Sequence, residues 1–116
     1  MVEISRISNL MENSNFMQKV YSAAEISELE ARGFPPQSAA AAFAAKEAFA
    51  KALGTGIRGF SLNEISLLHD ELGAPRLELA GRAKEIAANS GLTFTVSLTH
   101  TKEYAAAVVV AFTPNL

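Results

Sequence analysis

The stretch "FAAKEAFAKALGTGIRG", residues 43–59, decides the main element of the fold. Its first eleven residues are mostly strong helix formers, and Gly54 stands where a left-handed residue ends a helix. With the alanines that precede it, the stretch predicts a long helix from about Gln37 to Leu53. Pro36 fits the first turn of that helix, because the amide it lacks would be unpaired there. The run of alanines predicts that another element packs closely against the helix.

The residues before this helix predict shorter helices. Residues 5–21 read as one or two short helices with a break around Asn13. Ser22 and Glu25 match a capping box, in which a hydroxyl and a carboxylate bind the first free amides of a helix. That helix should run over about residues 22–32 and end at Gly33, a good left-handed cap.

The residues after the long helix alternate between strand and helix signals. Ser61 to Glu64 resembles another capping box, but β-prone residues follow it, so we expect a strand over about 64–69. "DELGAP", residues 70–75, has turn chemistry, and "RLEL" after it alternates as a returning strand. A helix is predicted over residues 81–89, closed by Gly91.

The C-terminal part predicts a hairpin. Residues 92–100 alternate strictly, which places Leu92, Phe94, Val96, Leu98 and His100 on one face. After a short turn, "YAAAVVVAF" is apolar on both faces and is therefore expected to be buried. The sequence thus predicts an α+β fold in which a long central helix packs on an antiparallel sheet.

Composition limits the function classes. The chain has 116 residues, which predicts one domain over 1–116, and 49% apolar with 19% charged residues is typical of globular proteins. No cysteine is present, so disulfides, thiol catalysis and zinc–thiolate sites are excluded. A net charge of −2 argues against a nucleic-acid binder, and no apolar run is long enough to span a membrane. Glu3 and Arg6 interrupt any export signal, so we expect a cytoplasmic protein.

Three features could carry chemistry, and each also has a simpler interpretation. Glu47 and Lys51 lie four residues apart on one helical face, where a solvated ion pair is the simpler reading. Residues 54–56, "GTG", follow the negative end of a helix dipole, so they suit a helix cap better than a phosphate cradle without added cations. His100 at a strand end is, by default, a histidine hydrogen-bonded within its hairpin.

Taken together, the motifs resemble a known family. "VEISRI" (residues 2–7), "FAAKEAFAKALGTGIRG" (43–59), "DELGAPRLELAGRA" (70–83) and "VSLTHTKEYAAAVVV" (96–110) resemble the holo-[acyl-carrier-protein] synthases, the small bacterial phosphopantetheinyl transferases, over essentially the whole chain. The resemblance implies transfer of 4′-phosphopantetheine from coenzyme A to a serine of acyl carrier protein, with release of adenosine 3′,5′-bisphosphate. It further implies a homotrimer that binds coenzyme A between neighbouring protomers, with a magnesium ion on the pyrophosphate.

The resemblance also assigns roles to residues. Glu47 matches the metal-binding glutamate, and Lys51 matches the lysine that lies against the pyrophosphate. The loop that lets the cofactor pass close to backbone corresponds to Gly54, Thr55 and Gly56. His100 matches a histidine that reaches the phosphates. The turn that borders the adenine corresponds to Gly73 and Pro75, with Ala74 in place of the usual lysine.

This sequence departs from the family pattern in three places. Ala42 stands where many members have arginine, which removes a cation near the phosphates. The early helical segment keeps Arg6 and Lys19 but few other basic residues, so docking of the acidic carrier protein is expected to rely on apolar side chains. The residues expected to contact the carrier are Arg6, Leu10, Met11, Phe16 and Met17.

The third departure concerns the start of the chain. The printed sequence begins at the isoleucine position after the family's metal-binding aspartate, so that aspartate and the strand leading to it are not in it. We therefore expect this chain to bind magnesium and coenzyme A weakly. Glu3 would be a poor substitute for the aspartate if it is helical. An added upstream Gly-Thr-Asp-Ile segment should raise activity. Two other readings stay open: a catalytically weak relative that still binds coenzyme A or a carrier, and a purely structural α+β domain.

Overall fold

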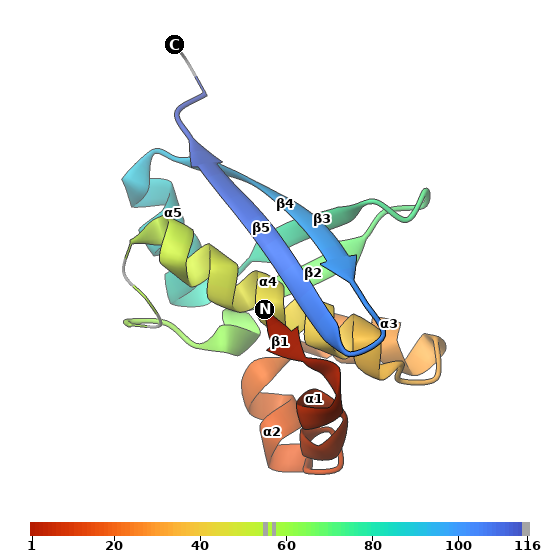
Figure 1. Ribbon diagram of the computed structural model, residues 1–116. Helices are drawn as coiled ribbons and strands as arrows, with labels where there is room; N and C mark the ends of the chain where they lie inside the picture. The colour runs from red at the N-terminus through yellow and green to blue at the C-terminus, as the bar shows by residue number, and fades with distance from the viewer. Residues whose placement is uncertain (55, 57, 115–116) are drawn as a thin grey trace.

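In the described residues, four shorter α-helices and five strands surround one long central helix. The computed structural model describes residues 1–54, 56 and 58–114, and Figure 1 shows the arrangement. In chain order the elements are β1 (Val2–Glu3), α1 (Ile4–Leu10), α2 (Ser14–Val20), α3 (Ala23–Ala31), α4 (Pro36–Leu53), the 3-10 turn η1 (Leu62–Glu64), β2 (Ile65–His69), β3 (Pro75–Leu79), α5 (Gly81–Ser90), β4 (Thr93–His100) and β5 (Tyr104–Phe112). The predicted α+β class is confirmed.

Helix α4 is the centre of the molecule. Pro36 occupies its first turn and Gly54 ends it with φ 87°, as the sequence predicts. The helix crosses the face of the three-stranded sheet β1–β5–β4, as Figure 1 shows. Its alanines from Ala39 to Ala45 are almost fully buried, because a surface of methyl groups lets the sheet and the other helices approach closely. Phe49 continues this contact into a second apolar cluster with Ile65 and the buried alanines of α5.

The register of β4 and β5 defines two faces of the sheet. Leu98 lies opposite Ala107 and His100 opposite Ala105, and this inner face packs toward α4. The outer face carries Tyr104, Ala106, Val108, Val110 and Phe112 of β5 beside the hydroxyl residues of β4. Val108 is 62% exposed and Val110 51% exposed, so the expectation that β5 is buried on both faces is wrong for the single chain. Period-two alternation of burial along β5 explains the difference.

The N-terminal residues form a short strand. Val2 and Glu3 pair with Ala105 and Tyr104 of β5, and the chain turns directly into α1. Glu3 is therefore extended and not helical, with φ −74° and ψ 122°. Within the described residues, no strand lies beside the remaining β5 edge, residues 106–112.

The segment before β2 forms a short 3-10 turn, and the strand predicted over about 64–69 follows it. Ser61 and Glu64 make a true capping box around η1, and the strand begins only at Ile65. The Glu64 carboxylate also accepts the amides of Arg82 and Ala83, each at 3.3 Å, and thereby caps α5 from a distant part of the chain. The predicted strand is confirmed, and the capping box occupies the residues directly before it.

The β2–β3 hairpin forms a second, two-stranded sheet that projects from the body of the molecule (Figure 1). The Asp70 carboxylate accepts the amides of Leu72 and Ala74, each at 2.9 Å, and so fixes the predicted turn. No helix in the described part of the chain combines the length and hydrophobicity needed to cross a bilayer.

Candidate functional site

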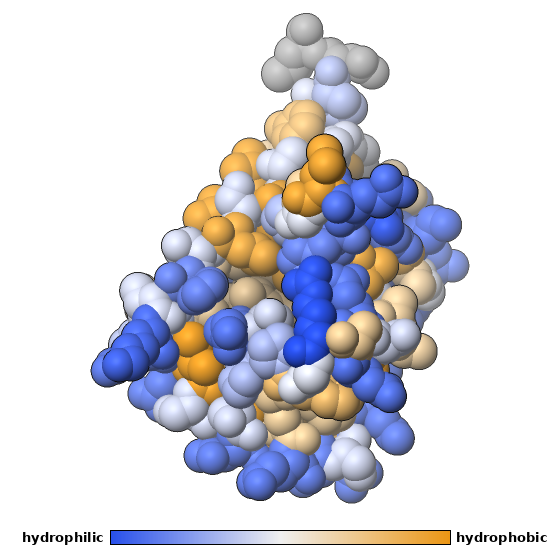
Figure 2. All heavy atoms as spheres, turned by 90° about the vertical axis from the view of Figure 1, so that its right-hand side faces the viewer, coloured by the Kyte–Doolittle hydropathy of each residue, from blue (hydrophilic) through white to orange (hydrophobic). Residues whose placement is uncertain are grey.

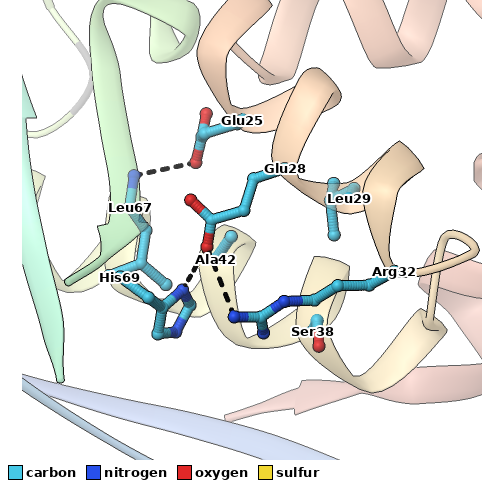
Figure 3. A pocket seen from close by; sticks show the side chains of 8 residues that line it. All are labelled: Glu25, Glu28, Leu29, Arg32, Ser38, Ala42, Leu67 and His69. Atoms are coloured by element: carbon cyan, nitrogen blue, oxygen red, sulfur yellow. Dashed lines mark hydrogen bonds and ion pairs between the residues drawn. The ribbon is translucent and has the colours of Figure 1, made fainter. Parts of the chain in front are cut away.

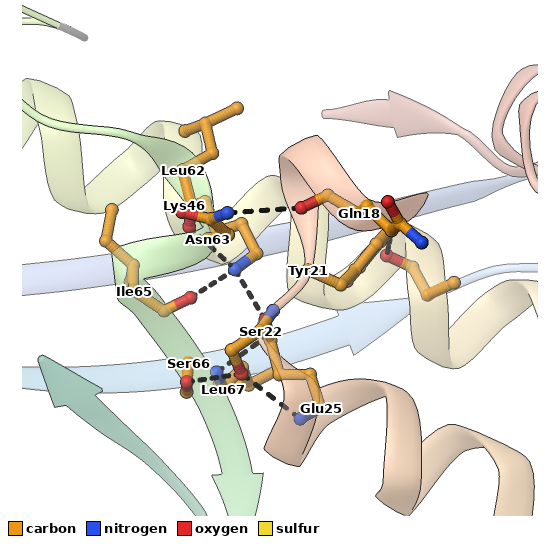
Figure 4. A network of polar contacts seen from close by, with 11 residues as sticks. Gln18, Tyr21, Ser22, Glu25, Lys46, Leu62, Asn63, Ile65, Ser66 and Leu67 are labelled. Carbon is orange, nitrogen blue, oxygen red and sulfur yellow. Dashed lines mark hydrogen bonds and ion pairs between the residues drawn. The ribbon is translucent and has the colours of Figure 1, made fainter. Parts of the chain in front are cut away.

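A buried ion pair holds α4 in place beside the predicted metal residue. The Lys46 ammonium is fully buried and donates to Glu25 Oε1 at 2.6 Å, to the Leu62 carbonyl at 3.0 Å and to the Ile65 carbonyl. Burial lowers the pKa of Lys46, and the charge of Glu25 opposes that change. Figure 4 shows how this network joins α4 to α3 and to the start of β2. The rotation of α4 about its axis is thereby fixed.

Glu25 completes the network from the N-terminal end of α3. Its carboxylate accepts the amides of Ser22 at 3.0 Å and of Leu67 at 2.9 Å, in addition to the lysine. Every charge-bearing atom of the pair therefore has partners, which is the condition under which a buried ion pair is tolerated. The tyrosine beside it, Tyr21, donates to the Ala39 carbonyl at 2.7 Å, and burial raises its pKa.

Glu47 and Lys51 point out of this fixed helix on its other side. Glu47 is half-buried and Lys51 is exposed in the last turn of α4. Among the ion pairs of the described residues, none joins Glu47 to Lys51. The solvated ion pair that spacing alone favours is therefore not formed, and both side chains remain available to a ligand.

The glycine loop follows directly. Gly54 has φ 87° and donates to the Lys51 carbonyl, and the Gly56 amide donates to the Ala50 carbonyl at 3.2 Å. Thr55, which the resemblance places in the same loop, lies outside the described residues. Because this loop stands at the negative end of the helix dipole, a phosphate there needs a cation, and Lys51 is the nearest one along the chain.

His100 lies elsewhere, at the end of β4, with Nδ1 3.3 Å from the Thr101 carbonyl. It lines a cleft of about 200 Å³ that we call the histidine cleft. The cleft is lined by Gln37, Ser38, Ala41, Leu67, His69, Leu98, Thr99 and His100. His69 was not among the predicted site residues, because no motif marks it; its only signal in the sequence is that it is one of the two histidines in the chain.

His69 also lines a small cavity on its other side, of about 20 Å³, near the volume of one water. Figure 3 shows this cavity between α3, α4 and β2, with Glu28 lying between His69 and Arg32. Ala42, where the resemblance gives an arginine, lines it too. Arg32 and His69 thus line the same cavity as Ala42, the position at which this chain lacks the arginine.

The predicted site residues fall into two groups within one chain. Glu47, Lys51 and the glycine loop belong to the C-terminal half of α4, whereas the histidine cleft lies against residues 37–41 at its N-terminal end. Ten residues of helix separate Ala41 from Lys51, which corresponds to about 15 Å. Gly73 lies in the β2–β3 turn and Pro75 begins β3, where it pairs with His69, so both belong with the second group.

The residues predicted to dock a carrier protein line or adjoin the surface of α1 and α2. Arg6 is exposed, whereas Leu10, Met11 and Phe16 are half-buried. Phe16 stacks on Phe43, with ring centroids 6.3 Å apart, so much of its surface contributes to the core. Met17 is only 9% exposed and lines a groove of about 540 Å³ together with Met11 and with Ile26 of α3.

The residues fit a magnesium ion only in part. Among the described residues, no group of three or more His, Asp or Glu side chains could hold a metal by itself. Glu47 supplies one carboxylate that has no ion-pair partner in the part of the chain that the structure describes. Magnesium often takes one or two protein carboxylates and fills its other positions with water and phosphate oxygens. The donor set therefore suits an ion that arrives with a phosphate ligand and does not suit a preformed protein cage.

Comparison with known proteins agrees with this geometry. The family model of the 4′-phosphopantetheinyl transferase superfamily matches residues 1–109. The holo-[acyl-carrier-protein] synthases of Caldanaerobacter subterraneus and Syntrophus aciditrophicus are 38% and 43% identical to this chain, with 95% of it covered in both and 88% and 89% of the relatives covered.

Solved structures are similar over the same length. The crystal structure of holo-[acyl-carrier-protein] synthase from Neisseria meningitidis has a TM-score of 0.87 at 34% identity, covering 96% of this chain and 92% of that one. The Helicobacter pylori holo-[acyl-carrier-protein] synthase in complex with coenzyme A has a TM-score of 0.81 at 30% identity, covering 96% and 95%.

Proposed function

Since this chain belongs to the 4′-phosphopantetheinyl transferase superfamily, we propose that it is a holo-[acyl-carrier-protein] synthase. It transfers 4′-phosphopantetheine from coenzyme A to a serine of acyl carrier protein. The serine oxygen forms a bond to the phosphorus next to pantetheine, and the pyrophosphate bond breaks. The serine loses its proton, and adenosine 3′,5′-bisphosphate leaves. The single observation that carries this proposal concerns Glu47 and Lys51, which lie on one helix that the buried Lys46 fixes. Neither side chain forms an ion pair within the described residues.

Each of the two residues has a role that its position supports. Phosphoryl transfer requires positioning and charge neutralisation more than covalent help from the protein. Lys51, exposed beside the glycine loop, stabilises the negative charge on the pyrophosphate and on the leaving group. Glu47 would hold the magnesium ion and orient the serine hydroxyl. A magnesium ion held there would supply stabilisation of the negative charge on the phosphates.

The distance between the two groups of residues favours a site shared by two copies of the chain. Glu47 and Lys51 lie about 15 Å along α4 from the histidine cleft, estimated from the helical rise. A neighbouring chain could bring its histidine cleft next to the Glu47–Lys51 pair. The exposed valines of the outer face of β5 offer an apolar surface for that contact. We therefore propose a homotrimer with coenzyme A between protomers. We further propose that it acts in the cytoplasm on a small acidic carrier protein.

Carrier docking is proposed on α1 and α2. Leu10 and Met11 offer partly exposed apolar surface, and Arg6 offers a cation beside them. Charges at the rim of such an interface mainly raise the rate of encounter with an acidic partner. The buried Met17 would pack beneath this surface and would not contact the carrier directly.

The test is a transfer assay on the whole chain. Apo acyl carrier protein, coenzyme A and magnesium are incubated with the protein, and intact-mass spectrometry follows the carrier. We expect a mass gain of one phosphopantetheine group that depends on magnesium. Binding of coenzyme A without any mass gain would instead support a relative that binds without efficient transfer, and absence of both would refute the proposal.

A further inference from the structure

The segment that joins α4 to η1 is anchored at its far end to helix α5. Gly59 lies against α5, where a Cβ on it would be 3.6 Å from Ile86 Cδ1. Phe60 packs edge-on against Phe49 of α4, with ring centroids 6.3 Å apart. Phe49 also belongs to the apolar cluster that contains the buried alanines of α5. This end of the segment is therefore held between α4 and α5.

The Glu64 side chain provides the polar part of this anchor. Its Oε1 accepts the amide of Ser61 at 3.1 Å and that of Ala83 at 3.3 Å, and its Oε2 accepts the amide of Arg82 at 3.3 Å. The backbone carbonyl of Glu64 also accepts the Ala80 amide at 2.9 Å. One residue thus binds the end of the segment and the start of α5 at the same time.

Gly81 shows how closely Glu64 approaches α5. The φ angle of Gly81 is 56°, in the left-handed region that favours glycine. A Cβ at this position would also collide with Oε2 of Glu64. The contact therefore requires glycine both for its backbone conformation and for its space. Capping alone does not require this arrangement, because a Ser, Asn or Asp in place of Ala80 would cap α5 locally. A carboxylate from outside the helix adds a connection between α5 and the segment before η1.

The anchored segment carries groups of the proposed coenzyme A site. Its first residue, Gly54, ends α4 directly after the turn that holds Lys51. Its exposed Arg58 directly precedes Gly59 and forms no ion pair among the described residues. Because the segment starts at the negative end of the α4 dipole, a phosphate beside it needs such cations. The position at which Arg58 meets a ligand therefore depends on where the anchor holds the chain.

We propose that Glu64 is a positioning residue for coenzyme A binding, acting through the segment that it ties to α5. The inference rests on the proposed function, which supplies coenzyme A as the ligand. With the anchor in place, the segment is already ordered before the ligand arrives. Without it, coenzyme A would have to order residues 58–61 itself, and that cost would weaken its binding. The rate of transfer from bound coenzyme A would change little.

Steady-state kinetics of Glu64→Gln tests the positioning role. In this variant one of the two carboxylate oxygens becomes an amide nitrogen, which cannot accept a hydrogen bond from a backbone amide. We expect the KM for coenzyme A to rise by roughly three- to tenfold, the size of one lost hydrogen bond, while kcat changes by less than about twofold.

The matched control is Ala88→Gly, at an exposed position inside α5. Glycine destabilises the same helix but removes no hydrogen bond of Glu64. Urea unfolding should show a loss of stability in both variants, whereas only Glu64→Gln should raise the KM. A KM that rises equally in Glu64→Gln and Ala88→Gly would overturn the inference, because the effect would then come from helix stability alone.

Gly81→Ala tests the same contact from the side of α5. The added methyl group displaces the Glu64 carboxylate, so this variant should also raise the KM. Because both changes break one contact, the double variant should raise it no further than the larger single effect. An unchanged KM in Glu64→Gln and Gly81→Ala would overturn the inference.

Amide hydrogen exchange provides a measurement that needs no substrate. The amides of residues 58–61 should exchange faster in Glu64→Gln than in Ala88→Gly, since local opening of the segment becomes easier. Equal exchange in the two variants would also overturn the inference. A wild type that neither binds coenzyme A nor transfers would refute the proposed function and this inference with it. A wild type that transfers, with Glu64→Gln keeping the same KM, would refute the inference alone.

Discussion

At the scale of single residues, two neighbours on α4 have opposite environments. Lys46 is fully buried with every donor used, whereas Glu47 is half-buried with no ion-pair partner among the described residues. A change at Lys46 should therefore affect folding, and a change at Glu47 should affect chemistry. This separation makes Glu47 a clean position for testing the proposed function.

Glu47→Gln should lower the transfer rate by roughly 100-fold or more, as removal of one group that stabilises transition-state charge does in other enzymes. The free energy of unfolding should change by less than about 0.5 kcal/mol, because the carboxylate supports no fold contact. The measurements are the mass-gain assay and urea unfolding. Glu30→Gln, an exposed change on α3, is the control. Undiminished transfer at saturating magnesium would remove Glu47 from the site.

Lys51→Ala should weaken coenzyme A binding and slow transfer, because the pyrophosphate loses its nearest fixed cation. Steady-state kinetics should show a raised KM for coenzyme A together with a lowered kcat, whereas Lys84→Ala should show neither. If Lys51→Ala altered only thermal stability, the side chain would belong to the helix surface and not to a ligand site.

The site was predictable from sequence only where a motif marks it. Glu47 and Lys51 share a helical face by spacing, and the resemblance gave them roles. His69 could not be predicted, because its place depends on a hairpin folding back against α3 and β4. Its partner Glu28 lies 41 residues away in sequence. Contacts at that separation leave no periodic pattern in the chain.

At the scale of elements, helix α5 depends on a residue outside it. Its N-cap is Ala80, which offers no side-chain acceptor, and the Glu64 carboxylate supplies one to the amides of Arg82 and Ala83. The same carboxylate accepts the Ser61 amide at 3.1 Å. These bonds, that of Ser61 first, lower the pKa of Glu64 below its ordinary value.

Glu64→Gln should destabilise the protein by about 1 kcal/mol at neutral pH, the usual cost of losing a helix cap. A carboxyl with a lowered folded pKa contributes stability above its unfolded value, about 4.5, and loses that contribution as pH falls through the folded value. Wild-type stability should therefore drop more steeply below pH 4.5 than that of Glu64→Gln. Urea unfolding across pH is the measurement.

The control for this prediction is Glu12→Gln, an exposed glutamate outside the capping network. It should keep the wild-type dependence on pH. Identical acid profiles for wild type and Glu64→Gln would mean that the capping bonds do not persist in solution.

Most elements were predictable because their signals are local. The capping box of Ser22, the proline start and glycine end of α4, and the alternation of β4 each involve residues close in sequence. One expectation was wrong because solvent exposure, and not local sequence, decides it. Strand β5 is apolar on both faces but is buried on only one of them in the single chain.

At the scale of the whole molecule, the outer face of β5 is the surface that most needs a partner. Figure 2, which shows the right-hand side of the view in Figure 1, has groups of hydrophobic atoms among polar ones, several of them on its upper left below the C-terminus. The exposed large residues of the outer face of β5 are Tyr104, Val108, Val110 and Phe112. Such a contiguous apolar surface on a small chain marks an interaction site.

Val110→Glu should convert the proposed trimer to monomers and abolish most transfer, because it places a charge in the apolar contact and separates the two halves of a shared site. Size-exclusion chromatography with light scattering gives the mass. Ala88→Glu, the same charge on exposed α5, should leave the assembly intact. A monomer mass for wild type at micromolar concentration would contradict both the trimer and the shared site.

The buried pair of Lys46 and Glu25 has a consequence for how this chain can change over generations. Loss of either partner alone strands a charge in the core, at a cost of about 3–5 kcal/mol, a large part of a typical domain's stability. Replacement of both by apolar residues of similar volume can be nearly neutral. A single substitution at either position is therefore strongly destabilising, whereas a paired substitution costs little stability. We therefore expect the two positions, which lie 21 residues apart, to change together in evolution.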